Sequence, residues 1–166
     1  MREETVHEEI AGVFGNRLRV RVCGICVQDN EILLVNTRNA TRPGDFWSPP
    51  GGGMYFGEPA HEALQREFRE ETGLEIAVGE FMFVHEFIGL PLHAVELFFR
   101  VEVVGGQLAK GRDPELLRQV IAEVGFYPFH EIRKHEPAAL HNLFRHCGNL
   151  AELLALRGYH QNPADR

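Results

Sequence analysis

The sequence GGGMYFGEPAHEALQREFREETGL, from Gly51 to Leu74, contains three consecutive glycines followed by a run of strong helix formers. Pro59 suits the first position of a helix, because its missing N–H group would have no partner there. Gly73 suits the left-handed position just past the end of a helix. The stretch therefore predicts a helix from about Glu58 to Thr72.

The acidic residues of this predicted helix lie on an unexpected face. At about 100° per residue, Glu67 and Glu71 fall within the apolar face formed by Leu64 and Phe68, and Glu70 falls at its edge. Buried carboxylates are paired, protonated or bound to metal. The i, i+3, i+4 spacing lets these three converge, and clustered carboxylates suit Mg²⁺ or Mn²⁺. The alternative is a solvated face with i, i+4 ion pairs, but such a face would not share a stripe with apolar residues.

The three glycines before the helix, Gly51, Gly52 and Gly53, add a second indication. Glycine lets the backbone approach a ligand closely, and a glycine-rich loop that runs into a helix N-terminus can bind an anion. Together with the acidic cluster, this predicted loop indicates a phosphate site bridged by metal.

The same residues resemble the Nudix box, G-x5-E-x7-R-E-U-x-E-E-x-G-U, in which U is apolar. Further similarity lies in FWSPPGGG (46–53) and GFYPFHEI (125–132), but it does not extend before Leu18 or far into the tail. All seven fixed positions of the box are filled, and Phe68 and Leu74 fill the apolar ones; the fixed residues are Gly52, Glu58, Arg66, Glu67, Glu70, Glu71 and Gly73.

The resemblance implies a hydrolase that cleaves a nucleoside diphosphate linked to a further group, with Mg²⁺ or Mn²⁺ as cofactor. It implies that Glu67, Glu70 and Glu71 carry the metal, with Glu58 as an auxiliary ligand. Either Glu67 or Glu70 would activate the attacking water, and the number of metal ions stays open.

Other residues have expected supporting roles. Arg66 lies one helical turn from Glu70 and would orient the ligand glutamates by ion pairing, although a surface ion pair of little consequence is the alternative. Gly52 and its neighbours would bring backbone groups to the metal or phosphate. Some Nudix proteins take a base from a later loop, for which Glu115 and Asp113 are the candidates here.

The rest of the chain predicts strands around this helix. We expect a hairpin of two strands at 18–28 and 31–37, and a short strand at 46–49 before the glycines. After the helix we expect two long strands at 74–88 and 92–104, a loop with some helical character at 107–119 and a last strand at 123–129. This order agrees with the α/β/α sandwich that the resemblance implies, an α+β fold with a mixed sheet flanked by helices. We expect one domain over 1–166, with a core at about 18–135.

The tail predicts an extra C-terminal helical extension at about 136–160. Apolar residues recur there at helical spacing, Gly148 interrupts them, and the end from Asn162 is expected to fray. The helix would pack on the sheet or form a homodimer. The residues with this spacing are Leu140, Leu143, Phe144, Cys147, Leu150, Leu153 and Leu154.

The composition limits the classes of function. The chain has 166 residues, 44% hydrophobic residues and a net charge of −7, which suits one domain and argues against binding of nucleic acid. We find no membrane span or signal peptide, and three cysteines make no disulfide framework, so we expect a cytoplasmic protein. Cys23 and Cys26 form C-x-x-C, but on a strand they should point to opposite faces.

Two questions stay open from the sequence. A catalytically silent Nudix domain that senses a nucleotide is the main alternative to the enzyme, although such a domain has no reason to keep all the glutamates. The substrate, a small nucleotide, could be a nucleoside triphosphate, a dinucleotide or an ADP-ribose-like sugar. We expect His85 and Glu96 to be polar residues near strand ends or in the cleft, and Trp47 to stack on a base or lie in the core.

Overall fold

A computed structural model of the chain describes residues 5–161. The frayed end that the sequence predicts for residues 162–166 lies outside this range. No helix within residues 5–161 is both long and apolar enough to cross a membrane.

The described residues form one mixed sheet of eight strands. Its order is β3-β2-β1-β6-β5-β8, with β4 paired to β1 and β7 paired to β2. The long strands β5 and β6 are antiparallel, whereas β1 and β6 are parallel. The strands are β1 (Arg17–Gln28), β2 (Glu31–Arg38), β3 (Asp45–Ser48), β4 (Gly51–Gly53), β5 (Leu74–Gly89), β6 (Leu92–Gly106), β7 (Ile121–Pro128) and β8 (Gly158–Gln161).

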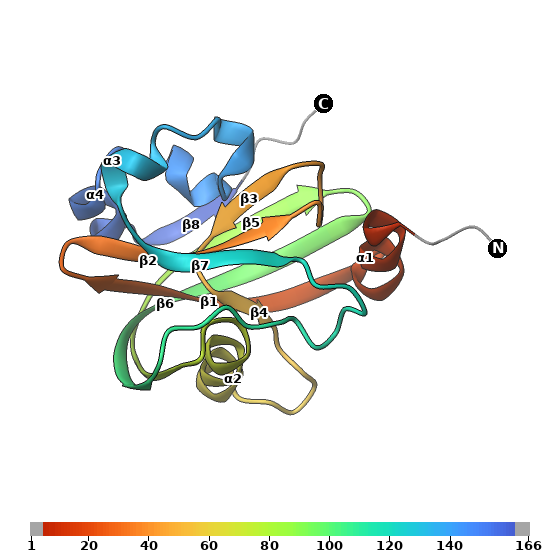
Figure 1. Cartoon of the computed structure of the whole chain (residues 1–166), viewed down its shortest axis with the longest axis horizontal. Coiled ribbons are helices and arrows are strands. Elements are labelled where there is room, and N and C mark those ends of the chain that lie inside the picture. Colours follow the sequence, from red (N-terminus) through yellow and green to blue (C-terminus); the bar gives the residue numbers. More distant parts are fainter. Residues whose placement is uncertain (1–4, 162–166) are drawn as a thin grey trace.

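Helices cover the sheet on two sides (Figure 1). Helix α2 lies below the sheet in this view, the C-terminal helices lie above it, and α1 lies at one end. This arrangement confirms the expected α+β fold with a mixed sheet between helical layers. The helices are α1 (Val6–Phe14), α2 (Ala60–Thr72), α3 (Phe129–Ile132) and α4 (Leu150–Ala155), with 3-10 turns at Pro137–Ala139 and Asn142–Arg145.

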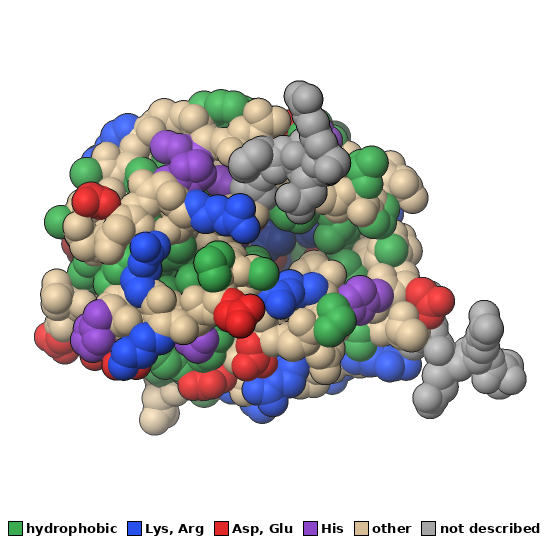
Figure 2. All heavy atoms as spheres, turned by 90° about the horizontal axis from the view of Figure 1, so that it is seen from above, with side chains coloured by type: hydrophobic (Ala, Val, Ile, Leu, Met, Phe, Trp, Pro, Cys, Tyr) green, Lys and Arg blue, Asp and Glu red, His purple; other side chains and the backbone are tan. Residues whose placement is uncertain are grey.

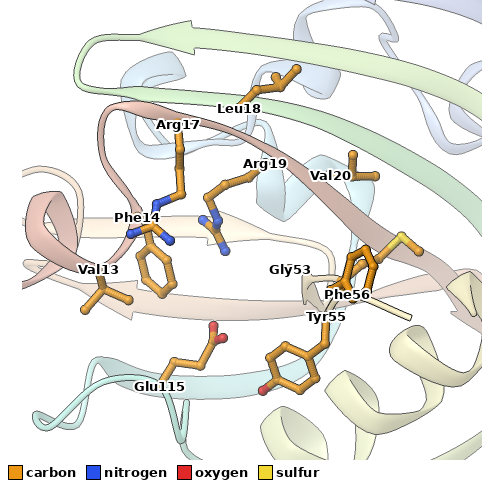
Figure 3. A pocket seen from close by; sticks show the side chains of 11 residues that line it. Val13, Phe14, Arg17, Leu18, Arg19, Val20, Gly53, Tyr55, Phe56 and Glu115 are labelled. Atoms are coloured by element: carbon orange, nitrogen blue, oxygen red, sulfur yellow. The ribbon is translucent and has the colours of Figure 1, made fainter. Parts of the chain in front are cut away.

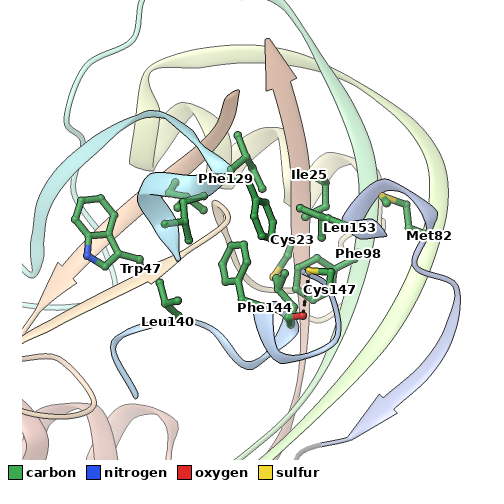
Figure 4. Packing of buried hydrophobic residues seen from close by; sticks show 14 of the residues in the cluster. Cys23, Ile25, Trp47, Met82, Phe98, Phe129, Leu140, Phe144, Cys147 and Leu153 are labelled. Carbon is green, nitrogen blue, oxygen red and sulfur yellow. Dashed lines mark hydrogen bonds between the residues drawn. The ribbon is translucent and has the colours of Figure 1, made fainter. Parts of the chain in front are cut away.

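Two apolar clusters hold these layers together. The first joins Cys23 of β1 to the C-terminal segment, including Phe144 and Leu153 (Figure 4). The second joins β1, through Val22 and Cys26, to α2. Because alternate strand residues point to opposite faces, β1 contributes to both clusters. The prediction that Cys23 and Cys26 face opposite sides is confirmed, and all three cysteines are buried and free.

The start of α2 differs from the prediction. The helix begins at Ala60, with Pro59 as its extended N-cap, whereas Gly73 ends it in the left-handed region at φ 72° as expected. Glu58 lies in the preceding turn, since its carboxylate accepts hydrogen bonds from the amide of Tyr55 and from Arg66. These contacts hold Glu58 outside the helix.

Two predicted loop features are also corrected. The glycines at 51–53 form strand β4, which pairs with Arg21–Cys23 of β1, because the tertiary fold provides a partner strand. The segment 107–119 contains no helix. Its backbone amides at Ala109, Gly111 and Arg112 instead bind the free carbonyl groups in the last turn of α2.

The tail departs most from its helical pattern. Only α4 is α-helical, the residues before Gly148 form 3-10 turns, and β8 adds a parallel strand beside β5 that the sequence did not predict. The backbone near Leu140 makes a β-bridge with Trp47, and the amide of His141 donates to the Trp47 carbonyl group. These contacts use backbone groups that a continuous α-helix would need.

Candidate metal and diphosphate site

Helix α2 places its glutamates as the face calculation predicts. Ala63, Leu64 and Phe68 are fully buried against the sheet, and Glu67 is buried among them with 7% of its surface exposed. Glu70 and Glu71 are half-buried on the following turn. Three carboxylates therefore occupy the boundary between the core and the solvent.

Arg66 connects two of these carboxylates, Glu67 and Glu70, to Glu58. Its Nε and Nη2 donate to both oxygens of Glu58 at 2.7 and 3.0 Å, and its Nη1 donates to Glu67 at 2.8 Å and to Glu70 at 3.1 Å. Nη2 also donates to the carbonyl group of Gly53 at 3.0 Å. The guanidinium thus fixes three carboxylates and the glycine strand in one arrangement.

Strand β4 lies directly against the carboxylates. The amide of Gly51 donates to Oε2 of Glu71 at 3.0 Å. A β-carbon at Gly52 would lie only 2.3 Å from Oε1 of Glu67, so only glycine allows this approach. The glycine strand therefore shapes the space around the glutamates.

The carboxylates of this cluster have less positive charge near them than they need for full ionisation. Burial raises the pKa of Glu67 to about 7, although Arg66 acts in the opposite direction. Burial, followed by the nearby charge of Glu67, also raises the pKa of Glu71 well above its ordinary value. A site built only of carboxylate and backbone oxygens, which are poorly compensated by one guanidinium, fits a hard divalent cation.

The late loop brings Glu115 toward the same cluster. The amides of Gly111 and Arg112 bind the carbonyl groups of Glu71 and Glu70, and the Glu115 amide binds Oδ1 of Asp113 at 2.9 Å. Burial, then Asp113, raises the pKa of Glu115, whereas the charges of Arg19 and Arg66 act in the opposite direction. Of the two candidate bases in this loop, Glu115 is the one that lines the neighbouring cleft.

That cleft has a volume of about 550 Å³ and opens beside Gly53. Figure 3 shows Arg17 and Arg19 extending from β1 into it, with Phe14 and Glu115 on its other sides. These arginines are not among the site residues predicted from the sequence. Their signal was the alternation RLRVR at residues 17–21, which places every second side chain on one face of a strand.

A buried polar network lies in the middle of the sheet, whereas the sequence predicts that His85 and Glu96 lie near strand ends or in the cleft. Nδ1 of His85 lies 3.0 Å, and Nε2 of His141 2.7 Å, from the same oxygen of Glu96. Arg21 connects this network to the glycine strand, because its Nε lies 3.9 Å from Glu96 and its Nη2 donates to the Gly51 carbonyl group.

The donor atoms of His85, Glu96 and His141 lie within 4.8 Å of one another, a spacing that a metal ion could bridge. However, Nδ1 of His141 accepts the backbone N–H of Leu143 at 3.0 Å, so the ring proton lies on Nε2 and points at Glu96. A histidine that binds a metal normally donates a hydrogen bond from its other nitrogen. The network is therefore better explained as hydrogen bonds around an ionised Glu96.

Trp47 lies in the core. It is 6% exposed and packs edge-on against Tyr127 with 5.0 Å between ring centroids. This position agrees with the core alternative.

Comparison with known proteins identifies the family. The NUDIX domain model matches residues 15–147, and this range contains α2, the glycine strand and the loop with Glu115. The chain belongs to the Nudix family. The Nudix box is thus the stretch in which Glu67 lies against Gly52 and accepts a hydrogen bond from Arg66.

Individual Nudix relatives match over parts of their length. An ADP-ribose pyrophosphatase of Methanocaldococcus jannaschii is 38% identical over 96 residues, which cover 57% of this chain and 56% of that protein. A CTP pyrophosphohydrolase of Escherichia coli is 35% identical over 65 residues, which cover 39% and 48%. The chain thus matches about half the length of these relatives.

Solved structures agree in fold. The MutT protein from Methanosarcina mazei superposes with a TM-score of 0.61 at 22% identity, covering 78% of this chain and 89% of that one. A MutT Nudix hydrolase from Burkholderia pseudomallei gives a TM-score of 0.60 at 24% identity, covering 82% and 96%. At these identities the likeness establishes the fold alone.

Proposed function

We propose that this chain is a metal-dependent hydrolase that cleaves a phosphoanhydride bond in a small molecule linked to a nucleoside diphosphate. The observation that carries the proposal is the contact between Gly52 and Glu67, with Arg66 holding Glu67, Glu70 and Glu58 beside it. The carboxylates lie together at the edge of the core, and the backbone of the glycine strand lies directly against them. This arrangement suits the binding of a metal ion and a diphosphate better than it suits a purely structural role.

The residues fit Mg²⁺ or Mn²⁺ as the cofactor. Glu67, Glu70 and Glu71 would hold the ion, with Glu58 and the carbonyl group of Gly52 as further ligands. When bound, such an ion neutralises charge on phosphate oxygens and lowers the pKa of bound water.

The chain's own residues would do the rest. Arg66 keeps the carboxylates in place, and the amide of Gly51 orients Glu71. A general base works best when its pKa lies near the operating pH. Burial raises the pKa of Glu67 toward this range in the metal-free chain, and Glu70 and the half-buried Glu115 are the alternatives as proton acceptors.

The substrate class is a small nucleotide. Relatives of this chain are named for activity on ADP-ribose, CTP and 8-oxo-dGTP. The net charge of −7 disfavours a nucleic acid, and acidic and basic side chains are intermixed on the face shown in Figure 2. We further propose that the chain forms a single domain and acts in the cytoplasm as a monomer or a homodimer.

A substrate screen tests this function. Phosphate release would be measured with nucleoside triphosphates, ADP-ribose, NADH, dinucleoside polyphosphates and nucleotide sugars, with Mg²⁺ or Mn²⁺ and with a chelator. Hydrolysis of one class that needs metal and is lost in Glu71→Gln would support the enzyme. Tight nucleotide binding without turnover of any compound would instead support the silent sensor.

A further inference from the structure

Three arginines occupy alternate positions on β1, at residues 17, 19 and 21, so they share one face of the strand. Arg21 is engaged, because it donates to Gly51 and lies 3.9 Å from Glu96. Within residues 5–161, neither Arg17 nor Arg19 has a carboxylate within 4.0 Å. Two guanidinium groups therefore lie beside the Nudix box without an ion pair.

Arg19 is held in place even though it lacks a carboxylate partner. Its Cζ lies 3.9 Å from the centre of the Phe14 ring, a cation–π contact. A β-carbon at Gly53 would lie 2.8 Å from its Nη2, so the guanidinium rests against the glycine strand. Burial, followed by the charge of Arg21, lowers the pKa of Arg19 to about 10, and the group stays positive at neutral pH.

Both arginines extend into the cleft of about 550 Å³ (Figure 3). The cleft joins the proposed diphosphate site through Gly53, whose carbonyl group binds Arg66. Glu115 lines the opposite side. The charges of Arg19 and Glu115 act on each other across the cleft, but the two groups form no ion pair within 4.0 Å in the described residues 5–161.

We propose that Arg17 and Arg19 form an anion subsite that binds a phosphate group beyond the diphosphate that is cleaved. This inference rests on the proposed function and narrows its substrate class to nucleoside triphosphates and longer polyphosphates. The two Cα atoms lie about 7 Å apart along the strand, a spacing that lets both side chains reach one terminal phosphate. ADP-ribose has no such phosphate and gains nothing from the subsite.

The test measures binding without turnover. Calorimetric titration in a chelator would compare ATP with ADP-ribose for the full chain, Arg19→Gln, Arg19→Lys and Arg17→Gln. Arg157→Gln is the matched control, because it removes one positive charge from an arginine that pairs with Glu80 and does not line the cleft. Thermal melting of each variant would show that it is folded.

We expect Arg19→Gln to weaken ATP binding about tenfold and Arg17→Gln to weaken it severalfold. ADP-ribose binding should change less than about twofold in both variants, and Arg19→Lys should restore part of the ATP affinity. Equal losses for both ligands, or no loss for ATP, would overturn the subsite.

The test of the anion subsite can be distinguished from the test of the proposed hydrolase activity. If no compound is hydrolysed but ATP binding depends on Arg19, the subsite stands and the catalytic proposal fails. If the chain hydrolyses ADP-ribose with metal and Arg19→Gln leaves ATP binding unchanged, the subsite fails and the hydrolase stands.

Discussion

Gly52 lies so close to Glu67 that a β-carbon at residue 52 would be 2.3 Å from Oε1 and 2.5 Å from Oε2 of that carboxylate. Both residues are buried, one on β4 and the other on α2. The missing side chain at residue 52 therefore leaves room for the carboxylate of Glu67, the first of the proposed metal ligands in the Nudix box.

Gly52→Ala should disable the site while the fold survives. The added methyl group displaces the Glu67 carboxylate, and a displacement of about 1 Å at such a site can cost about 100-fold in rate. The measurement is kcat with the substrate found in the screen. Gly12→Ala is the control, because a β-carbon there meets nothing within 4 Å. Equal activity in both variants would show that the contact between Gly52 and Glu67 is not needed for activity.

Glu70→Gln and Glu71→Gln should each lower turnover at least about 100-fold, because each removes a charge from the proposed metal site. Mn²⁺ titration would locate the loss in metal binding. Glu62→Gln, on the exposed face of the same helix, should keep its activity. Near-normal turnover of both site variants would show that the ligand assignment is wrong.

Arg66→Lys should weaken metal binding although it keeps the positive charge. Lysine cannot reproduce the fork that binds Glu58, Glu67 and Glu70 at once. We expect the Kd for Mn²⁺ to rise about tenfold and the melting temperature to change little for the metal-free protein. A metal dependence identical to that of the unmodified chain would reject the orienting role.

Metal affinity should depend on pH through Glu67. The folded-state pKa of this group is raised to about 7, so its contribution to stability is complete below its unfolded value and is lost as the pH rises through about 7. Metal needs the ionised form, so affinity should rise over the same interval and binding should release protons. Calorimetry in buffers of different ionisation enthalpy, near pH 6 and pH 8, measures this release. An affinity that is constant between these values would contradict the prediction.

Glu96→Gln should destabilise the protein by about 3–5 kcal/mol near pH 7, as expected when one partner of a buried ionic network is removed. Burial alone would raise the pKa of Glu96, but His141, the hydrogen bond from His85 and the charge of Arg21 hold it below its ordinary value. This contribution is present above the unfolded pKa and is lost as the pH falls through the folded one.

Urea unfolding of the unmodified chain and Glu96→Gln, near pH 7 and near pH 3, measures the difference. The gap between them should narrow in acid. Glu86→Gln breaks the more exposed pair with His93 and should have a smaller effect. A gap of the same size at both pH values would mean that the ionised carboxylate is not what stabilises the network.

The sequence by itself determined α2 and which glutamates share its apolar face, because helical spacing and the terminating Gly73 act within one short segment. It also determined the two long strands, through their apolar composition. The role assigned to each glutamate stays a prediction.

Only the tertiary structure decided how distant segments meet. Gly51–Gly53 form a strand because β1 supplies its hydrogen bonds. The tail is not a continuous helix because parts of its backbone pair with β3 and β5. The contact of Glu96 with His141, 45 residues away, depends on the same packing. Local periodicity carries no information about such partners, since each forms only when both segments are already in place.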